Sequence, residues 1–432
     1  MNTLIINRVT PKKRFSSFTC GWETKLYGDI YSFYSTNSLS RDKLNYESGE
    51  VFNIHYGDIH TKFSTMFYLT EELVPVINVE VDLSRYSEEK YCQEGDLVIA
   101  DASEGYADIG KTIEIVNLNN ERILAGLHTF LARPNKYEMA LGFAGYLMQS
   151  WRVRKQVMVI AQGSKVLGLA TGRLGKVKLN IPKFSEQQKI ASFLITVDEK
   201  LKQLTKKKDL LQDYKKGIMQ KIFSQELRFK DEFGNNYPDW EEKKLGEVGV
   251  TFNGLTGKTK EDFGRGKPYI QYMQIFNSAK IDTSKFGYVD VKEGEKQKTA
   301  KYGDVFFTTS SETPMEIGYA SVLTEDTEEL YLNSFCFGYR PNSLNELYPD
   351  FASYLFRSES LRKQIVKLAQ GSTRYNMSKV QLMKVLIQLP SLEEQQKIAN
   401  FLSSLDSKIE LVSNQIENTK AFKKGLLQQM FV

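Results

Sequence analysis

The chain has 432 residues, of which 41% are hydrophobic and 26% charged, so it is long enough for two or three soluble globular domains. No apolar run approaches the ~20 residues that span a bilayer, and the first ten residues lack the pattern of a secretory signal, so we expect a cytoplasmic protein without a membrane role. A net charge of +5 permits binding to a polyanion, but a protein that coats DNA without sequence preference is usually far more basic. The cysteines, Cys20, Cys92 and Cys336, are too far apart in sequence to indicate a disulfide framework or a zinc site.

Short strands and helices are predicted in each half, separated by clusters of Gly, Asn, Asp and Ser. In chain order they are a strand at Asp96–Ala100, a helix near Met139–Val159, a strand at Lys176–Leu179, a long helix downstream of Pro182, a strand at Asp304–Thr308, a helix near Leu347–Leu368, a strand at Val385–Leu389 and a second long helix downstream of Pro390. This order predicts an α+β fold in which a small globular domain precedes each long helix.

The second half of the chain repeats the first half. Residues 181–223 realign without gaps on residues 389–431, 208 positions later, with 16 identities in 43 positions. Gly95-Asp96 and the segment 161–164, AQGS, repeat in the same frame, whereas Trp22-Glu23 repeats 218 positions later at Trp240-Glu241. The first copy therefore has ten extra residues (218 − 208) between Trp22 and Gly95, and we expect them in exposed loops, where insertions are tolerated.

Each long helix carries a heptad pattern. Apolar residues recur alternately four and three positions apart, at eight of ten positions in each copy, and this 3.5-residue period predicts a coiled-coil seam. The predicted seam residues are Ile190, Leu194, Val197, Leu201, Leu204, Leu211, Ile218, Ile398, Leu402, Leu405, Ile409, Val412, Ile416 and Leu426. If a pseudo-two-fold axis relates the copies, the helices run antiparallel and act as a ruler between two globular domains; simple dimerisation through the helices is the alternative.

The helix starts are predicted from capping-box patterns, Ser185 with Gln188 and Ser391 with Glu394. A helix of about 39 residues is ~58 Å long, more than one turn of B-DNA. We divide the chain into a first globular domain at 1–180, a helix and linker at 181–237, a second globular domain at 238–388 and a second helix at 389–432.

These features together resemble one known family. The helices open with SEQQKIA at 185–191 and EEQQKIA at 393–399, the linker runs from RFKD at 228–231 to PDWE at 238–241, and GSTRYNMS at 371–378 precedes the second helix. This order of motifs resembles the specificity subunits of Type I restriction-modification enzymes over essentially the full chain.

The resemblance implies two pseudo-symmetric target recognition domains, each reading one half of a bipartite site in double-stranded DNA, while two long antiparallel helices set the unread gap. It also implies two methyltransferase subunits that dock on this chain and modify adenine N6 with S-adenosylmethionine, and restriction subunits in the full complex. The chain itself is then not an enzyme and holds no cofactor.

Eight residues in Gly- or Ser-rich stretches are the candidate DNA contacts, since side chains there can reach a groove or a phosphate. They are Ser164, Lys165, Lys258, Arg265, Lys267, Ser372, Arg374 and Tyr375. The first half departs from the second, because Gly163-Ser164 is followed by KVL and not by the TRYN that follows Ser372. We therefore do not assume equal roles for the two segments.

Catalytic motifs are incomplete. An adenine methyltransferase needs an (N/D)PP(Y/F)-type motif, and the chain has no Pro-Pro pair. The segment GLTGKT at 254–259 has Phe252 where a phosphate loop requires glycine, so we expect a Gly-rich surface turn. DFGRG at 262–266 lacks the rest of a cofactor-binding motif, and the acidic residues at 239–242 are too closely spaced for a nuclease site.

The three histidines, His55, His60 and His128, could supply a base or a metal ligand, but no acidic motif frames them and only two are close in sequence. We expect histidines in loops or with structural hydrogen bonds, and no metal site. Two other functions stay open: a non-catalytic coiled-coil adaptor that binds proteins without touching DNA, and a stand-alone modification enzyme, which the missing base-flipping motif disfavours.

Overall fold

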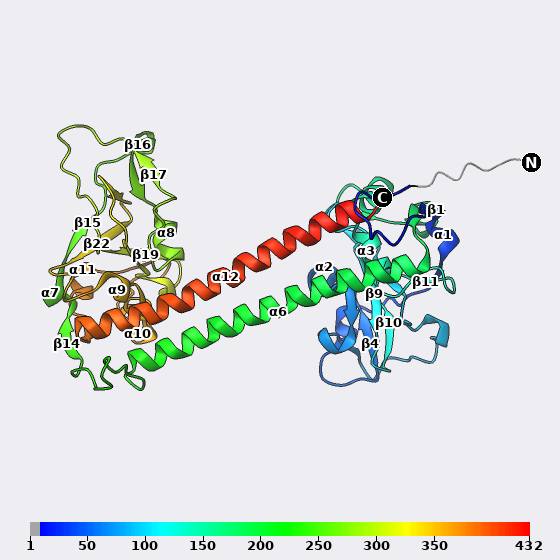
Figure 1. The fold of residues 1–432 in the computed structure, drawn as a ribbon, viewed down its shortest axis with the longest axis horizontal. Coiled ribbons are helices and arrows are strands. Elements are labelled where there is room, and N and C mark those ends of the chain that lie inside the picture. Colours follow the sequence, from blue (N-terminus) through cyan, green and yellow to red (C-terminus); the bar gives the residue numbers. More distant parts are fainter. Residues whose placement is uncertain (1–8) are drawn as a thin grey trace, which may run out of the picture. The chain divides into compact units, whose positions relative to one another are not determined.

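The computed structural model describes residues 9–432, and the chain divides into two compact units. Unit 1 comprises the chain up to Thr205 together with Asn414–Val432, and unit 2 comprises Lys206–Ser413. Figure 1 traces the chain by colour from unit 1 into unit 2 along helix α6 (Phe184–Phe223), and then along helix α12 (Leu392–Met430), which ends in unit 1. Residues 1–8, part of the segment in which we expect no secretory signal, lie outside the described residues. None of the helices in residues 9–432 combines the length and hydropathy that crossing a bilayer requires.

Unit 1 is built on two mixed sheets with strand orders β2-β11-β7-β9-β5 and β10-β4-β6-β3. The pairs β5–β9 and β4–β10 are parallel, and the other neighbours are antiparallel. The strands of unit 1 are β1 (Glu23–Leu26), β2 (Tyr31–Tyr34), β3 (Leu44–Asn45), β4 (Val51–Ile54), β5 (Met66–Tyr68), β6 (Val76–Ile77), β7 (Leu97–Ala100), β8 (Ala102–Ser103), β9 (Thr112–Asn117), β10 (Arg122–Ala125), β11 (Thr129–Pro134), β12 (Leu167–Gly168) and β13 (Lys178–Ile181). Its short helices are α1 (Tyr27–Ile30), α2 (Tyr56–Thr61), α3 (Ala144–Gln149), α4 (Trp151–Ile160) and α5 (Thr171–Leu174).

Unit 2 repeats this plan with one strand fewer in each main sheet, in the orders β15-β22-β18-β20 and β17-β16-β21. Its strands are β14 (Glu241–Lys244), β15 (Gly249–Asn253), β16 (Phe263–Ile270), β17 (Gly287–Val289), β18 (Val305–Thr308), β19 (Ser310–Ser311), β20 (Ala320–Val322), β21 (Tyr331–Leu332), β22 (Cys336–Pro341), β23 (Tyr375–Asn376) and β24 (Leu386–Leu389). Its short helices are α7 (Leu245–Val248), α8 (Tyr272–Asn277), α9 (Pro349–Leu355), α10 (Glu359–Val366) and α11 (Lys379–Leu382).

The central strand of each larger sheet is buried on both faces. In β7, Leu97 and Ile99 face a core shared with α3 and α6, while Val98 and Ala100 face a second core between the two sheets of unit 1. Alternate side chains of a strand point to opposite faces, so such a strand is apolar throughout. Its counterpart β18 has the same arrangement in unit 2, and the mixed helix and sheet content agrees with the predicted α+β class.

The ten extra residues, which we predicted in exposed loops, belong to the stretch between Trp22 and Gly95. In the same stretch, unit 1 has two short strands, β3 and β5, at the edges of its two sheets. The counterpart of β5 in unit 2 is reduced to a single parallel bridge between Lys280 and Val322. The two units thus differ at the edges of their sheets and share the central strands.

The predicted helices near Met139–Val159 and Leu347–Leu368 are each divided into two shorter helices in the structure, so the prediction of single helices was wrong. Helices α3 and α4 meet at Ser150, and α9 and α10 are separated by Phe356–Ser358. The serine at each break has extended backbone angles that start the next helix, and Ser358 also accepts a hydrogen bond from the Leu361 amide. A serine inside an apolar helical pattern was the available signal.

The long helices begin close to the predicted capping serines: α12 begins at Leu392, directly after Ser391, and α6 begins at Phe184, one residue before Ser185. Helix α12 uses Ser391, whose Oγ accepts from the Glu394 amide at 3.4 Å. The corresponding prediction for Ser185 was wrong, since Ser185 lies inside the first turn of α6 and Lys183 occupies the position before it.

The seam residues are all buried or half-buried. In unit 1, Ile190 and Leu194 of α6 share a core with Leu426 and Met430 of α12. The chain directions oppose each other there, because Asn180, just before α6, donates to the carbonyl of Val432, while Asp198 pairs with Lys423 at 2.6 Å. In unit 2, Ile222 shares a core with Ile398 and Leu402.

Candidate nucleic-acid interface

The glutamate in the opening motif of each long helix is buried and tied to the start of its globular domain. In unit 1, Glu186 accepts hydrogen bonds from Arg14 at 2.6 and 2.7 Å and from the Trp22 indole at 3.3 Å. The pKa of Arg14 is raised, chiefly by its hydrogen bond to Glu186. These charge-assisted bonds fix the helix to the strand that follows Trp22.

The same arrangement recurs in unit 2. There Glu394 accepts from Arg228 at 2.8 Å and from the Trp240 indole at 3.0 Å. The pair Arg14 and Arg228 shows that the repeat begins earlier than sequence analysis found. The shared Arg-Phe dipeptide at 14–15 and 228–229 was the signal that we missed, because its distance from the tryptophan differs between the halves.

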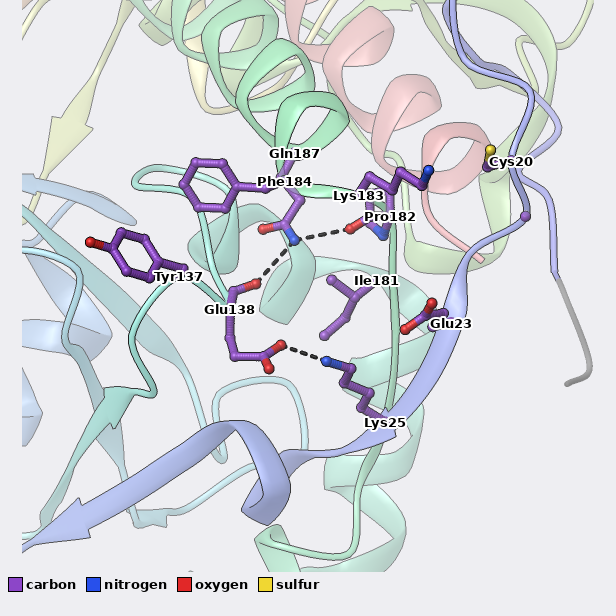
Figure 2. A pocket seen from close by; sticks show the side chains of 11 residues that line it. Cys20, Glu23, Lys25, Tyr137, Glu138, Ile181, Pro182, Lys183, Phe184 and Gln187 are labelled. Carbon is purple, nitrogen blue, oxygen red and sulfur yellow. Dashed lines mark hydrogen bonds and ion pairs between the residues drawn. The ribbon is translucent and has the colours of Figure 1, made fainter. Parts of the chain in front are cut away.

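The glutamine that follows each of these glutamates bridges the helix to a neighbouring loop. Figure 2 shows Gln187 donating to the carbonyls of Pro182 and Glu138, at 3.0 and 3.1 Å. Gln395 makes the corresponding bonds to Pro390 and Glu346 in unit 2, at 3.0 and 2.8 Å. Buried amides whose bonds are all satisfied hold both helix starts in one orientation.

A hollow of about 250 Å³ lies beside this anchor in unit 1. Figure 2 shows Lys25 and Glu138 pointing toward each other across it, and their ion pair is 2.6 Å long. Lys243 and Glu346 form the counterpart pair in unit 2, at 2.9 Å. Since these polar groups are already paired within the fold, the hollow belongs to the scaffold.

The end of each long helix closes a core that another part of the chain begins. In unit 1, Phe431 packs against Trp22 and Phe143 with ring centroids 6.3 and 5.7 Å apart. In unit 2, Phe223 packs in the same way against Trp240 and Phe351. Each unit therefore needs the beginning of one long helix and the end of the other.

The two segments before the long helices form the same turn in both units. We call residues 163–167 and 371–375 the pre-helix turns. Gly163 and Gly371 have φ of 138° and 123°, and a Cβ atom would lie 1.9 Å from the Val166 carbonyl oxygen and 2.3 Å from that of Arg374. Both turns are closed by an antiparallel bridge, Gln162 with Gly168 and Gln370 with Asn376. Glycine is required at these positions because the backbone is left-handed and tightly folded.

The candidate side chains of the pre-helix turns are exposed. Ser164 and Lys165 are exposed in unit 1, as are Ser372 and Arg374 in unit 2, whereas Tyr375 is half-buried in β23. The backbone frame is thus shared, while the side chains at its tip differ. This is the combination that two readers of different sequences require.

The three remaining candidates lie elsewhere in unit 2. Lys258 is bound to Glu295 at 2.6 Å with 5% of its side chain exposed, so the fold itself uses the charge that we predicted as a DNA contact. The segment around it leads into one turn of 3-10 helix at Lys260–Asp262, which also excludes a phosphate loop. Lys267 pairs with Glu329, and Arg265 lies 3.9 Å from Asp290 with 79% of its side chain exposed. Both residues belong to β16, a strand that Figure 1 shows at the end of unit 2 away from α6 and α12.

All three histidines lie around Tyr56 in unit 1, although only two are close in sequence. Their rings are 4.7 Å (His55), 5.8 Å (His60) and 5.3 Å (His128) from the Tyr56 ring. Burial lowers the pKa of His55 to about 4, and its Nδ1 accepts from the Gly57 amide. Within residues 9–432, no group of three or more His, Cys, Asp or Glu side chains could hold a metal ion.

A second pair of turns lies next to the pre-helix turns and was missed by sequence analysis. In unit 1, His128 follows β10 with φ of 54°, and its carbonyl accepts from the Asp101 amide at 3.1 Å. In unit 2, Phe335 is 62% exposed at the corresponding turn, and its carbonyl accepts from the Thr309 amide at 3.3 Å. In each unit this second turn lies beside the pre-helix turn of the same unit. The reason is that β8, which follows Asp101, pairs with β12, and β19, which follows Thr309, pairs with β23.

Comparisons with known proteins address both halves. A family model described as the Type I restriction modification DNA specificity domain matches residues 21–212 and again residues 237–420. The specificity subunit of the Type I restriction enzyme MjaVIII from Methanocaldococcus jannaschii is 28% identical over 261 residues, which cover 58% of this chain and 60% of that protein. The match therefore spans less than two thirds of that relative.

Solved structures share the fold. The S subunit of a Type I restriction-modification system from M. genitalium has a TM-score of 0.54 at 16% identity, with 98% of this chain and 99% of that chain covered. A chain from a structure on complex assembly and conformational transition of the type I R-M system has a TM-score of 0.57 at 16% identity, with 94% and 96% covered.

Proposed function

Because this chain belongs to the family of Type I restriction-modification DNA specificity domains, with one matched region in each half, we propose that it reads an asymmetric bipartite site in double-stranded DNA. Each unit reads one half-site, and the chain catalyses nothing itself. The observation that carries this proposal is the pair of pre-helix turns, which share a backbone and a closing bridge but present Lys165-Val166 in one unit and Thr373-Arg374 in the other. Contacts to base edges specify sequence, so different tips on one frame give two different half-sites.

The long helices set the unread gap between the half-sites. Each helix is unbroken where the chain passes from one unit to the other, between Thr205 and Lys206 in α6 and between Ser413 and Asn414 in α12. Helices of 40 and 39 residues are each ~60 Å long at 1.5 Å per residue. A continuous helix resists compression, so it fixes the separation of two reading surfaces better than a loop would.

The same helices form the docking scaffold for two methyltransferase subunits. Gln188 and Gln396 are exposed and identical in the two copies, and so are Lys200 and Lys408. None of the four makes a side-chain hydrogen bond or ion pair within residues 9–432. Exposed side chains that both copies share, and that the fold does not use, fit a partner that meets each copy in the same way.

The docked methyltransferase subunits bind S-adenosylmethionine and modify adenine N6, and restriction subunits join them in the full complex. No step of that chemistry needs a group from this chain, which only places the partners on the DNA. Double-stranded DNA and two kinds of subunit are therefore its partners.

The test is methylation-motif sequencing of a host that carries this chain with its methyltransferase partner. We expect one bipartite motif with two different half-sites and a fixed gap. A continuous or palindromic motif would contradict the proposal. A coiled-coil adaptor predicts copurification with proteins but no sequence-selective binding to duplex DNA, and a stand-alone enzyme predicts methyl transfer by the purified chain alone.

A further inference from the structure

A basic cleft of about 1180 Å³ opens in unit 2, between the second half of α6 and helix α10. Six cationic side chains line it, namely Lys215, Lys216, Arg357, Arg362, Lys363 and Lys367. Among the described residues that line it, the only acidic ones are Glu359 and Asp406. Glu359 pairs with Lys363 at 2.6 Å and Asp406 pairs with Lys215, so four positive charges remain unmatched.

Two of the unmatched charges are fixed guanidinium groups. Arg357 donates to the carbonyls of Ala320 and Ile275 at 2.7 Å and to those of Phe276 and Ser278 at 3.2 and 2.8 Å. Arg362 donates to the carbonyls of Gly318 and Met315 at 2.9 Å. Neither arginine has a carboxylate partner within residues 9–432. Both guanidinium groups are half-buried, and their carbonyl partners carry no net charge, so the positive charges stay available to an anion that enters the cleft.

Tyr319 holds the two guanidinium groups in place. The Arg357 and Arg362 carbons lie 4.7 and 4.6 Å from the centre of its ring. Burial lowers the pKa of Arg357 to about 10, so the group is still charged at neutral pH. Stacked, hydrogen-bonded guanidinium groups lose little freedom on binding and suit the geometry of a phosphate.

Two of the four unmatched charges are specific to unit 2. At the positions 208 residues earlier, unit 1 has Gln149 for Arg357 and Val159 for Lys367, and it has Lys111 for Tyr319, whereas Arg362 and Lys216 have identical counterparts in Arg154 and Lys424. A partner that docks alike on both halves needs the same surface twice, so these differences argue against a docked protein subunit. They fit a contact that belongs to one half-site only.

The cleft also connects with the candidate reading surface. The loop between β19 and β20 carries Met315 and Gly318, whose carbonyls hold Arg362, and β19 pairs with β23 at the end of the pre-helix turn. Arg374 lies on that turn. One loop thus links the unmatched charges to a side chain that we assign to base reading.

We propose that this cleft binds the phosphate backbone of DNA beside the half-site that unit 2 reads, through Lys216, Lys367, Arg357 and Arg362. The inference rests on the proposed function and adds to it an anchoring site of which unit 1 lacks two of the four cations, those of Arg357 and Lys367. Phosphate contacts position a reader without specifying sequence, so the cleft strengthens binding to any duplex that the chain engages.

The test neutralises the two exposed lysines and leaves the half-buried arginines intact. Lys216→Gln with Lys367→Gln is compared with wild type in the full-length chain, by binding to fluorescent duplexes that contain the methylated motif or a scrambled one, from 50 to 200 mM salt. Each lost phosphate contact reduces the steepness of log affinity against log salt by about 0.9, so we expect a reduction of about 1.8 for the double variant. The ratio of wild-type affinity to variant affinity should therefore fall by about 12-fold between 50 and 200 mM salt. The preference for the motif over the scrambled duplex should stay unchanged.

Lys424→Gln is the matched control, because Lys424 occupies the position of Lys216 in the other helix. An unchanged salt slope in the double variant would overturn the inference, as would an equal reduction in Lys424→Gln, which would assign the effect to the helix lysines in general. Loss of copurifying methyltransferase with an unchanged slope would assign the cleft to an acidic protein segment. If wild type itself shows no motif preference at any salt concentration, the proposed function fails instead.

Discussion

Lengthening both long helices should lengthen the gap between the half-sites by a calculable amount. One heptad inserted after Thr205 and another after Ser413 keeps the seam in register and adds 10.5 Å to each helix, which equals about 3 base pairs at 3.4 Å each. It also turns the half-sites relative to each other by about 100°, since B-DNA has about 10.5 base pairs per turn. Three heptads add 31.5 Å, or about 9 base pairs, and return the half-sites nearly to the same face.

We therefore expect motif sequencing to report an unchanged pair of half-sites in both variants. The gap should be about 3 base pairs longer, with weak methylation, for one heptad, and about 9 base pairs longer, with stronger methylation, for three. Insertion into α6 alone is the control, because it breaks the antiparallel pairing and should abolish methylation. An unchanged gap in a methylating three-heptad variant would refute the idea that the helices act as a ruler.

Three further predictions concern single side chains. Glu394→Ala leaves Arg228 and the Trp240 indole without their buried acceptor, so it should lower the free energy of unfolding, measured by urea titration, by about 3 kcal/mol. The control Glu393→Ala, at an exposed position of the same helical turn, should change that free energy by less than about 0.5 kcal/mol. The pKa of His55 is about 4 in the fold and 6.5 ordinarily, so its contribution to stability is present above pH 6.5 and is lost as the pH falls from 6.5 toward 4. His55→Gln copies Gln271, which stands before α8 in unit 2 as His55 stands before α2, and it should flatten this loss of stability in acid. An equally steep loss of stability in the variant would contradict this prediction. Arg374→Ala should relax one half-site by about 5- to 150-fold in competition binding and leave the other half-site intact, whereas Lys258→Met should alter stability and no base preference.

The frame of the molecule could be predicted from the sequence because it depends on local patterns. The heptad spacing from Ile190 onward indicates a long helix wherever it stands, and the shared offset of 208 indicates that the second half repeats the first. The sequence also singled out the opening motif of each helix. It did not show that Glu186 binds Arg14 and Trp22, because these residues precede it by 172 and 164 positions.

The candidate DNA-contacting surface could be predicted only in part, because it is assembled by tertiary contacts. Lys258 has the sequence context of a DNA contact, and only the fold shows that Glu295 neutralises it. His128 joins His55 around Tyr56 through the sheet order, for which no spacing in the sequence is a signal. The pre-helix turns were found because their glycines occupy identical positions in both copies.

The closing of unit 1 by the end of α12 has a consequence for biosynthesis. Trp22 and Phe143 leave the ribosome early, yet Phe431, which packs against both, is translated only after the whole of unit 2. The first half of the chain therefore waits through the synthesis of the second with part of its core open to water, a state in which apolar surfaces invite aggregation and chaperone binding. A premature stop codon before Leu426 would thus destabilise unit 1, whose other residues lie far from that position in sequence, while leaving the core of unit 2 complete.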